Sequence, residues 1–97
     1  MKRDDFVFTI GFEGSTAVVD SRSRKRYGSM TTMQLAQEGL FRQAFCSALY
    51  SGDEPEMQEL LTWFQANTRF DASTSLSLKR LFGVFEVPKG INRILSV

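Results

Sequence analysis

The chain has 97 residues and a net charge of +1, and its hydrophobic and charged fractions of 42% and 24% are those of an ordinary globular domain. It contains no histidine and one cysteine, Cys46, which excludes an internal disulfide, a cysteine-based zinc site and a histidine general base. No apolar run approaches the ~18 residues of a membrane span, and Met1 opens a polar run instead of a signal peptide. We therefore expect one cytoplasmic domain without a membrane, metal or cofactor partner.

The first expected element is an antiparallel β-hairpin over residues 6–20. Its first run has an apolar side chain at every second position, which is typical of a strand with one buried face: Phe6, Phe8, Ile10 and Phe12. A three-residue turn, Glu13-Gly14-Ser15, separates this run from a second apolar run. Because an isolated hairpin is barely stable in water, we expect its phenylalanine face to pack against the helical remainder of the chain.

The other face of the hairpin carries uncharged and β-branched side chains, namely Val7, Thr9, Thr16 and Val18. Such side chains are typical of a covered sheet surface, and a two-stranded hairpin leaves both of its edges free to pair with another strand. We therefore interpret this face as a candidate interface, through which the chain binds a second copy of itself or another protein.

A basic segment over residues 21–29 follows the hairpin and holds four cations within five residues: Arg22, Arg24, Lys25 and Arg26. No apolar periodicity accompanies them, which indicates a solvated loop. Cations at this density neutralise phosphates, and the neighbouring Tyr27 offers a ring on which a base can stack. Nucleic acid is therefore the alternative partner. The competing interpretation is a hydrated loop, or one that pairs with the acidic start of the helix expected over residues 54–67.

Three helices are expected in the remainder of the chain, over residues 31–50, 54–67 and 74–85. At the start of the first, Thr31 and Gln34 have the spacing of a capping box. Gly39 lies inside this helix, where a glycine costs about 1 kcal/mol relative to alanine. It therefore marks either a close approach of the hairpin backbone or a break in the helix.

The second helix has the clearest start signals. Asp53 can cap it, Glu56 completes a capping box, and Pro55 lies in the first turn, where its missing N–H does no harm. The third helix is less sharply defined, because the alternation of Leu76 and Leu78 also suits a strand.

After a break at Pro88–Gly90, residues 91–95 predict one short helical turn. The expected fold class is α+β, with an N-terminal antiparallel β-hairpin packed on about three α-helices and a short C-terminal element. The residues expected to be most buried lie on the apolar faces of their elements: Phe8, Ile10, Phe45, Leu61 and Phe64.

Three further groups could carry chemistry, and each is better explained structurally. The acidic residues of 53–59 suit a helix N-terminus and lack the interleaved glycine and carbonyl ligands of a calcium loop. Cys46 lies in an apolar run with no histidine to activate it. The glycines of 11–15 lead into a strand, whereas phosphate loops lead into a helix. With no catalytic motif, we expect a small, non-enzymatic interaction or regulatory module that self-associates. The alternative is a nucleic-acid-binding domain that uses residues 22–26.

Overall fold

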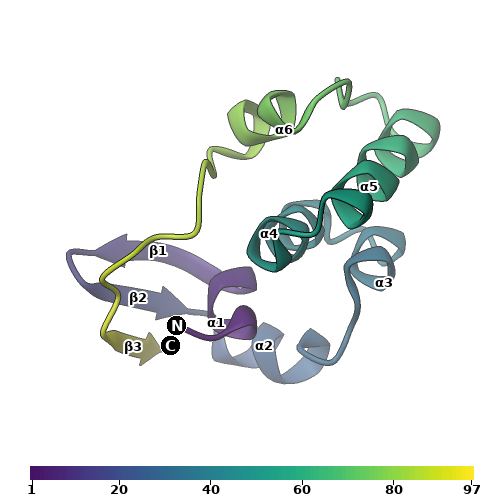
Figure 1. The fold of residues 1–97 in the computed structure, drawn as a ribbon. Coiled ribbons are helices and arrows are strands. Elements are labelled where there is room, and N and C mark those ends of the chain that lie inside the picture. Colours follow the sequence, from purple (N-terminus) through teal and green to yellow (C-terminus); the bar gives the residue numbers. More distant parts are fainter.

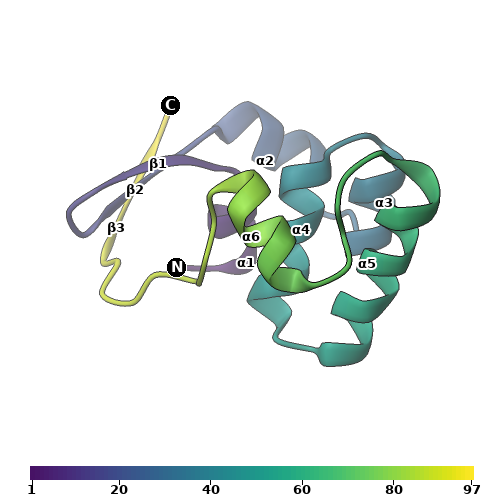
Figure 2. The same cartoon turned by 90° about the horizontal axis from the view of Figure 1, so that it is seen from above.

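The computed structural model describes all 97 residues and has an α+β fold of six helices and one three-stranded sheet (Figure 1). The elements follow one another as α1 (Arg3–Val7), β1 (Thr9–Glu13), β2 (Thr16–Val19), α2 (Ser21–Tyr27), α3 (Thr32–Gln37), α4 (Phe41–Ser51), α5 (Glu54–Asn67), α6 (Ser75–Phe82) and β3 (Arg93–Ser96). The sheet lies at one end of the molecule, and α3, α4 and α5 gather at the other (Figure 1 and Figure 2). The α+β class expected from the sequence is confirmed, with six helices in place of about three.

The N-terminal residues form the short helix α1, so the hairpin begins at Thr9 and not at Phe6 as predicted. The Asp5 carboxylate accepts a hydrogen bond from the backbone N–H of Lys2 at 3.1 Å, which favours a first helical turn over an extended strand. Phe6 and Phe8 are nevertheless buried, because they reach the core from the helix and from its C-terminal turn. The period-two interpretation of the phenylalanines is therefore wrong in this segment.

The pairing of β1 with β2 is irregular at Ile10. Thr9 and Gly11 pair with consecutive residues of β2, so Ile10 has no partner there. A bulge of this kind inserts one extra residue and interrupts the alternation of side chains along the strand. Ile10 is 65% exposed and Phe12 is 42% exposed. The prediction that Ile10 lies in the core is therefore wrong.

The central strand of the sheet is β2, which pairs antiparallel with β1 and parallel with β3. The hairpin turn consists of Gly14 and Ser15, and Gly14 has the positive φ of 58° that the first position of such a turn requires. On the opposite edge, the N–H of Arg93 donates to the Ser15 carbonyl at 3.3 Å, and the N–H of Val97 donates to the Val19 carbonyl at 3.0 Å. The C-terminal residues, predicted to form a helical turn, therefore form a strand.

The basic segment predicted as a loop folds into helix α2. Asp20 is its N-cap, and its side chain accepts hydrogen bonds from the backbone N–H of Ser23 at 3.2 Å and from the Ser23 hydroxyl at 2.8 Å. These two bonds favour the carboxylate and so lower the pKa of Asp20. The prediction placed Asp20 in the preceding strand and therefore overlooked its capping role.

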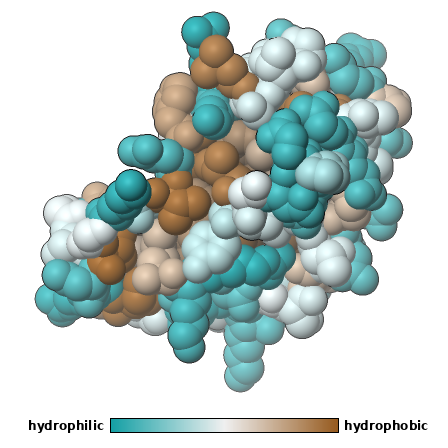
Figure 3. Space-filling view, viewed as in Figure 1, coloured by the Kyte–Doolittle hydropathy of each residue, from teal (hydrophilic) through white to brown (hydrophobic).

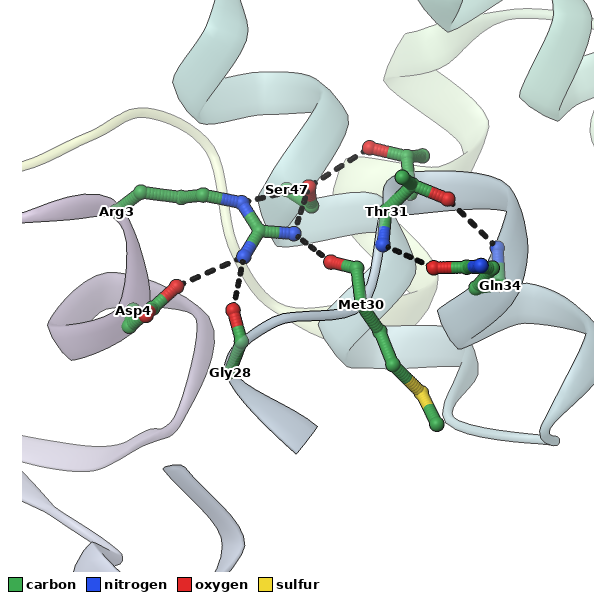
Figure 4. A network of polar contacts seen from close by, with 8 residues as sticks. Arg3, Asp4, Gly28, Met30, Thr31, Gln34 and Ser47 are labelled. Atoms are coloured by element: carbon green, nitrogen blue, oxygen red, sulfur yellow. Dashed lines mark hydrogen bonds and ion pairs between the residues drawn. The ribbon is translucent and has the colours of Figure 1, made fainter. Parts of the chain in front are cut away.

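The long helix predicted for residues 31–50 is two helices, α3 and α4, which separate at Gly39. Gly39 has a φ of 86°, a left-handed conformation that favours glycine, so the alternative of a helix break is correct. The capping box at the start of α3 is confirmed (Figure 4). The Thr31 hydroxyl accepts from the Gln34 N–H at 3.2 Å, and the Gln34 side chain accepts from the Thr31 N–H at 2.9 Å.

Helix α5 has the range predicted for it, although its capping differs. Asp53 occupies the N-cap position without a side-chain hydrogen bond, and Glu56 accepts a hydrogen bond from the Ser51 hydroxyl instead of closing a capping box. Helix α6, capped by Thr74, decides against the strand alternative and ends at Phe82, three residues earlier than predicted. No helix of the chain combines the length and apolar character needed to cross a bilayer.

The core is centred on α4 and includes buried residues of α1, β2, α3, α5 and α6. The ring of Phe45 on α4 lies 5.7 Å from that of Phe82 on α6. Phe64 of α5 is at the centre of an aromatic cluster, with its ring centroid 5.7 Å from that of Phe41 and 5.8 Å from that of Phe70. Four of the five residues predicted to be most buried are so: Phe8, Phe45, Leu61 and Phe64.

Candidate functional site

One face of the sheet packs on the core and the other is open. Ala17 and Val19 of β2 have no exposed surface, so they belong to the inner face. Because successive side chains of a strand point to opposite faces, Thr16 and Val18 belong to the outer face. Both are only half-buried. This outer face, which we call the open sheet face, is the surface that the sequence predicted as an interface.

Two rows of side chains cross the open sheet face from β1 through β2 to β3. The strand register aligns Glu13, Thr16 and Arg93 in the first row. It aligns Gly11, Val18 and Leu95 in the second. Each row therefore crosses the central strand β2. The first row has an acidic residue on β1 at one edge and a basic residue on β3 at the other. The second row runs from a residue without a side chain to a leucine that is 42% exposed.

Two of the four predicted interface residues do not lie on this face. Val7 belongs to α1 and has no exposed surface. Thr9 is 3% exposed, and its hydroxyl donates to the carbonyl of Asp5 in the preceding helix. Their assignment to an interface is therefore wrong, because the strand starts later and α1 occupies the region where they were placed. Thr16 and Val18 do lie on the open sheet face.

Three residues of the open sheet face were missed, namely Glu13, Leu95 and Arg93. Glu13 was taken as part of the turn, although it pairs with Thr16 at the end of β1. The other two were missed because β3 was predicted to be helical. Arg93–Ser96 do not alternate between polar and apolar residues, so the sequence carried no period-two signal for this strand.

The helical conformation of α2 sorts its cations onto two sides. Arg22, Lys25 and Arg26 are exposed and lie three and four positions apart, so they share one face of the helix. We call this trio the basic face. Arg24 points away from it and forms an ion pair with Asp5 at 2.7 Å, together with a hydrogen bond to the Ser96 hydroxyl at 2.9 Å. The four cations therefore do not act as one cluster, and the acid that pairs with Arg24 belongs to α1 and not to the start of α5.

Tyr27 is not free to stack on a base as predicted. It is half-buried and packs against the hydrophobic core, while the guanidinium of Arg26 lies 5.2 Å from the centre of its ring. A cation over an aromatic face gains about 0.5–1 kcal/mol at an exposed site, which helps to hold Arg26 in place. The basic face thus offers three cations and no available aromatic ring.

Neither Cys46 nor the acidic start of α5 has the surroundings of a reactive site. Burial raises the pKa of the Cys46 thiol to about 11, and the nearby charge of Arg42 offsets this effect only in part. No group of three or more histidine, cysteine, aspartate or glutamate side chains converges as a metal site would require.

No family model, curated protein or solved structure matches this chain. Its function is therefore inferred from the geometry and charge of its accessible surfaces.

Proposed function

We propose that this chain is a small, non-enzymatic interaction module that self-associates through the open sheet face. The observation that supports this function is the order of side chains in the two rows, which makes the face complementary to a copy of itself. The free thiol of Cys46 suits a reducing compartment, so the proposed location is the cytoplasm.

The complementarity follows from a two-fold axis that runs along β2, between two copies placed face to face. Such an axis leaves the position of each row along the strands unchanged, but it places β1 of one copy opposite β3 of the other. The same patch of both copies therefore meets itself, as in an isologous interface. Glu13 of one copy then faces Arg93 of the other. Leu95 faces Gly11, where a Cβ atom would meet nothing within 4 Å, and Val18 faces its own counterpart. The strands of the two sheets remain aligned, as in sandwich packing.

The size of the face predicts a weak dimer. Strands about 4.8 Å apart with a rise of about 3.3 Å per residue give this three-stranded face an area of roughly 200–300 Å². Stable interfaces bury about 800 Å² on each partner. We therefore expect dissociation at about 10–100 μM, so that both monomer and dimer are populated at accessible concentrations.

The substitution Val18→Lys should convert the chain to a monomer without unfolding it. Two lysines would face each other across the axis, and neither could lose its water without an opposite charge nearby. Sedimentation velocity over about 10–500 μM should show the wild type approaching twice 11.0 kDa and the variant remaining at that mass. Gln65→Lys, an added lysine at an exposed position of α5, is the matched control and should still dimerise. A wild type that stays monomeric throughout the range would rule the dimer out.

Charge reversal tests the orientation of the two copies. Glu13→Arg and Arg93→Glu should each weaken the dimer, because each variant brings like charges together twice across the axis. The double variant restores opposite charges and should recover most of the wild-type affinity. If the double variant is weaker than either single variant, then the two copies do not meet about an axis along β2.

The basic face supports nucleic acid as a second candidate partner, because it presents three cations without an acidic partner on one side of one helix. Replacing Arg22, Lys25 and Arg26 by serine should abolish binding to duplex DNA. For the wild type, three phosphate contacts give a slope of about −2.7 in a log–log plot of affinity against salt. The matched control replaces three exposed cations elsewhere, Arg69, Arg80 and Lys89, and should keep that slope. No wild-type binding at about 50 mM salt would exclude this partner.

A further inference from the structure

A groove of about 300 Å³ lies between β1 and the segment that follows α6. Its apolar lining comes from both sides: Phe6, Phe12, Val84, Phe85 and Pro88. Figure 3 shows apolar side chains at the surface along the course of this C-terminal segment, from α6 down to the sheet. The volume is at the lower end of the range for small-molecule sites, which are concave and mostly apolar with a few placed polar groups.

Two aromatic rings in this groove are unusually exposed for phenylalanine. Phe12 is 42% exposed and Phe85 is 54% exposed. They come from segments more than seventy residues apart in the sequence, and both line the groove. Contiguous exposed apolar surface of this kind is typical of a ligand-binding site. A ligand that covers such a surface removes apolar area from water, which is favourable.

The groove also contains one cation that has no acidic partner. Arg42 projects from the first turn of α4, is half-buried, and makes no ion pair. One of its terminal nitrogens donates to the Thr9 carbonyl at 3.2 Å, and its other donors have no partner in the chain. An arginine carries five N–H donors, and those of Arg42 that have no partner in the chain are accessible to solvent. The guanidinium is thus available for an acceptor from outside.

The acids nearest to this groove do not neutralise Arg42. Asp20 shares a neighbouring cleft with it, but both oxygens of that carboxylate are bonded to Ser23. Glu86 lines the groove itself, yet it is exposed and lies outside ion-pair distance of Arg42. The only charge that is both half-buried and unpaired in the groove is therefore positive.

We infer that this groove binds a small-molecule carboxylate with an apolar tail or ring. The carboxylate would take the two-pronged hydrogen bond that arginine offers to planar acids, and the apolar part would cover Phe12 and Phe85. Arg42 and Phe85 lie outside the open sheet face, whereas Gly11 borders both surfaces, so binding is followed at groove residues that do not belong to that face.

The test uses three probes that share one tail, namely octanoate, octanol and octylamine, titrated to about 10 mM against isotope-labelled chain. Octanoate should shift the amide signals of Val84, Phe85 and Glu86 and should bind about tenfold tighter than octanol, with octylamine the weakest. Equal binding of octanoate and octanol, or tighter binding of octylamine, would overturn the inference. So would binding of an apolar tetrapeptide with a free C-terminus in the absence of octanoate binding, because the occupant would then be a protein.

Variants separate the charge from the apolar walls. Arg42→Gln keeps a donor for the Thr9 carbonyl and should remove the preference for octanoate over octanol. Glu86→Gln should strengthen octanoate binding by removing a like charge from the groove. Glu59→Gln makes the same charge change at an exposed position of α5 and should leave binding unchanged. A folded Arg42→Gln variant, judged by its unchanged circular dichroism, that still prefers octanoate would contradict the role of this residue.

Discussion

Replacing Phe64 by alanine should lower the free energy of unfolding by about 3–5 kcal/mol, because it leaves a large cavity at the centre of the aromatic cluster. Phe64 has no exposed surface. Besides Phe41 and Phe70, its ring packs against Trp63 and Phe82, with centroid distances of 5.7 and 6.2 Å. Aromatic pairs at such distances add to the effect of burial alone. A domain of this size is stable by only about 5–15 kcal/mol, so the loss is a large fraction of the total.

Chemical denaturation followed by circular dichroism measures this loss. Phe85→Ala is the matched control, since it makes the same chemical change at a ring that is 54% exposed. We expect it to cost less than about 1 kcal/mol, because most of the ring is already in water. If Phe64→Ala lowers the free energy of unfolding as little as the control does, then α5 does not hold the core together in the way its buried side chains indicate.

The parts of this fold that could be predicted from the sequence are those fixed by neighbouring residues. The capping box of α3 is formed by two residues three positions apart, and the start of α5 follows from Pro55 in its first turn. The hairpin turn is likewise set by Gly14. In each case the residues that give the signal lie within a few positions of the structure that they specify. These features can therefore be predicted without knowing any tertiary contact.

The parts that could not be predicted depend on residues far apart in the sequence. Strand β3 is a strand because its N–H groups reach β2, more than seventy residues earlier. Its own four residues carry too short a pattern to distinguish strand from helix. The bulge at Ile10 likewise appears only when β1 is aligned with its partner. Each of these features requires the pairing to be known first.

The same limit applies to the candidate sites. The row of Glu13, Thr16 and Arg93 exists only once β3 lies beside β2. The density of cations in the basic segment could be recognised from sequence, but their division into a paired Arg24 and an exposed trio depends on Asp5 of α1. Charge density was therefore predictable, whereas its neutralisation was not.

Replacing Arg3 by alanine should lower the free energy of unfolding by about 2–4 kcal/mol, because its guanidinium joins three segments (Figure 4). One terminal nitrogen donates to the Met30 carbonyl at 2.6 Å and to the Ser47 hydroxyl at 2.9 Å. The other donates to the Gly28 carbonyl at 3.1 Å and to Asp4 at 2.7 Å. These bonds tie α1 to the connection between α2 and α3 and to α4.

Arg3→Lys should recover little of this loss, because a single ammonium group cannot reach acceptors that are spread around a planar fork. The ion pair with Asp4 is partly exposed and contributes little by itself. The main acceptors are uncharged, so the effect of Arg3→Ala should persist at about 1 M salt, where exposed ion pairs are screened. Arg69→Ala, at an exposed arginine without a hydrogen bond, should change stability by less than about 0.5 kcal/mol. An Arg3→Ala variant as stable as that control would show that the three segments are held together without this residue.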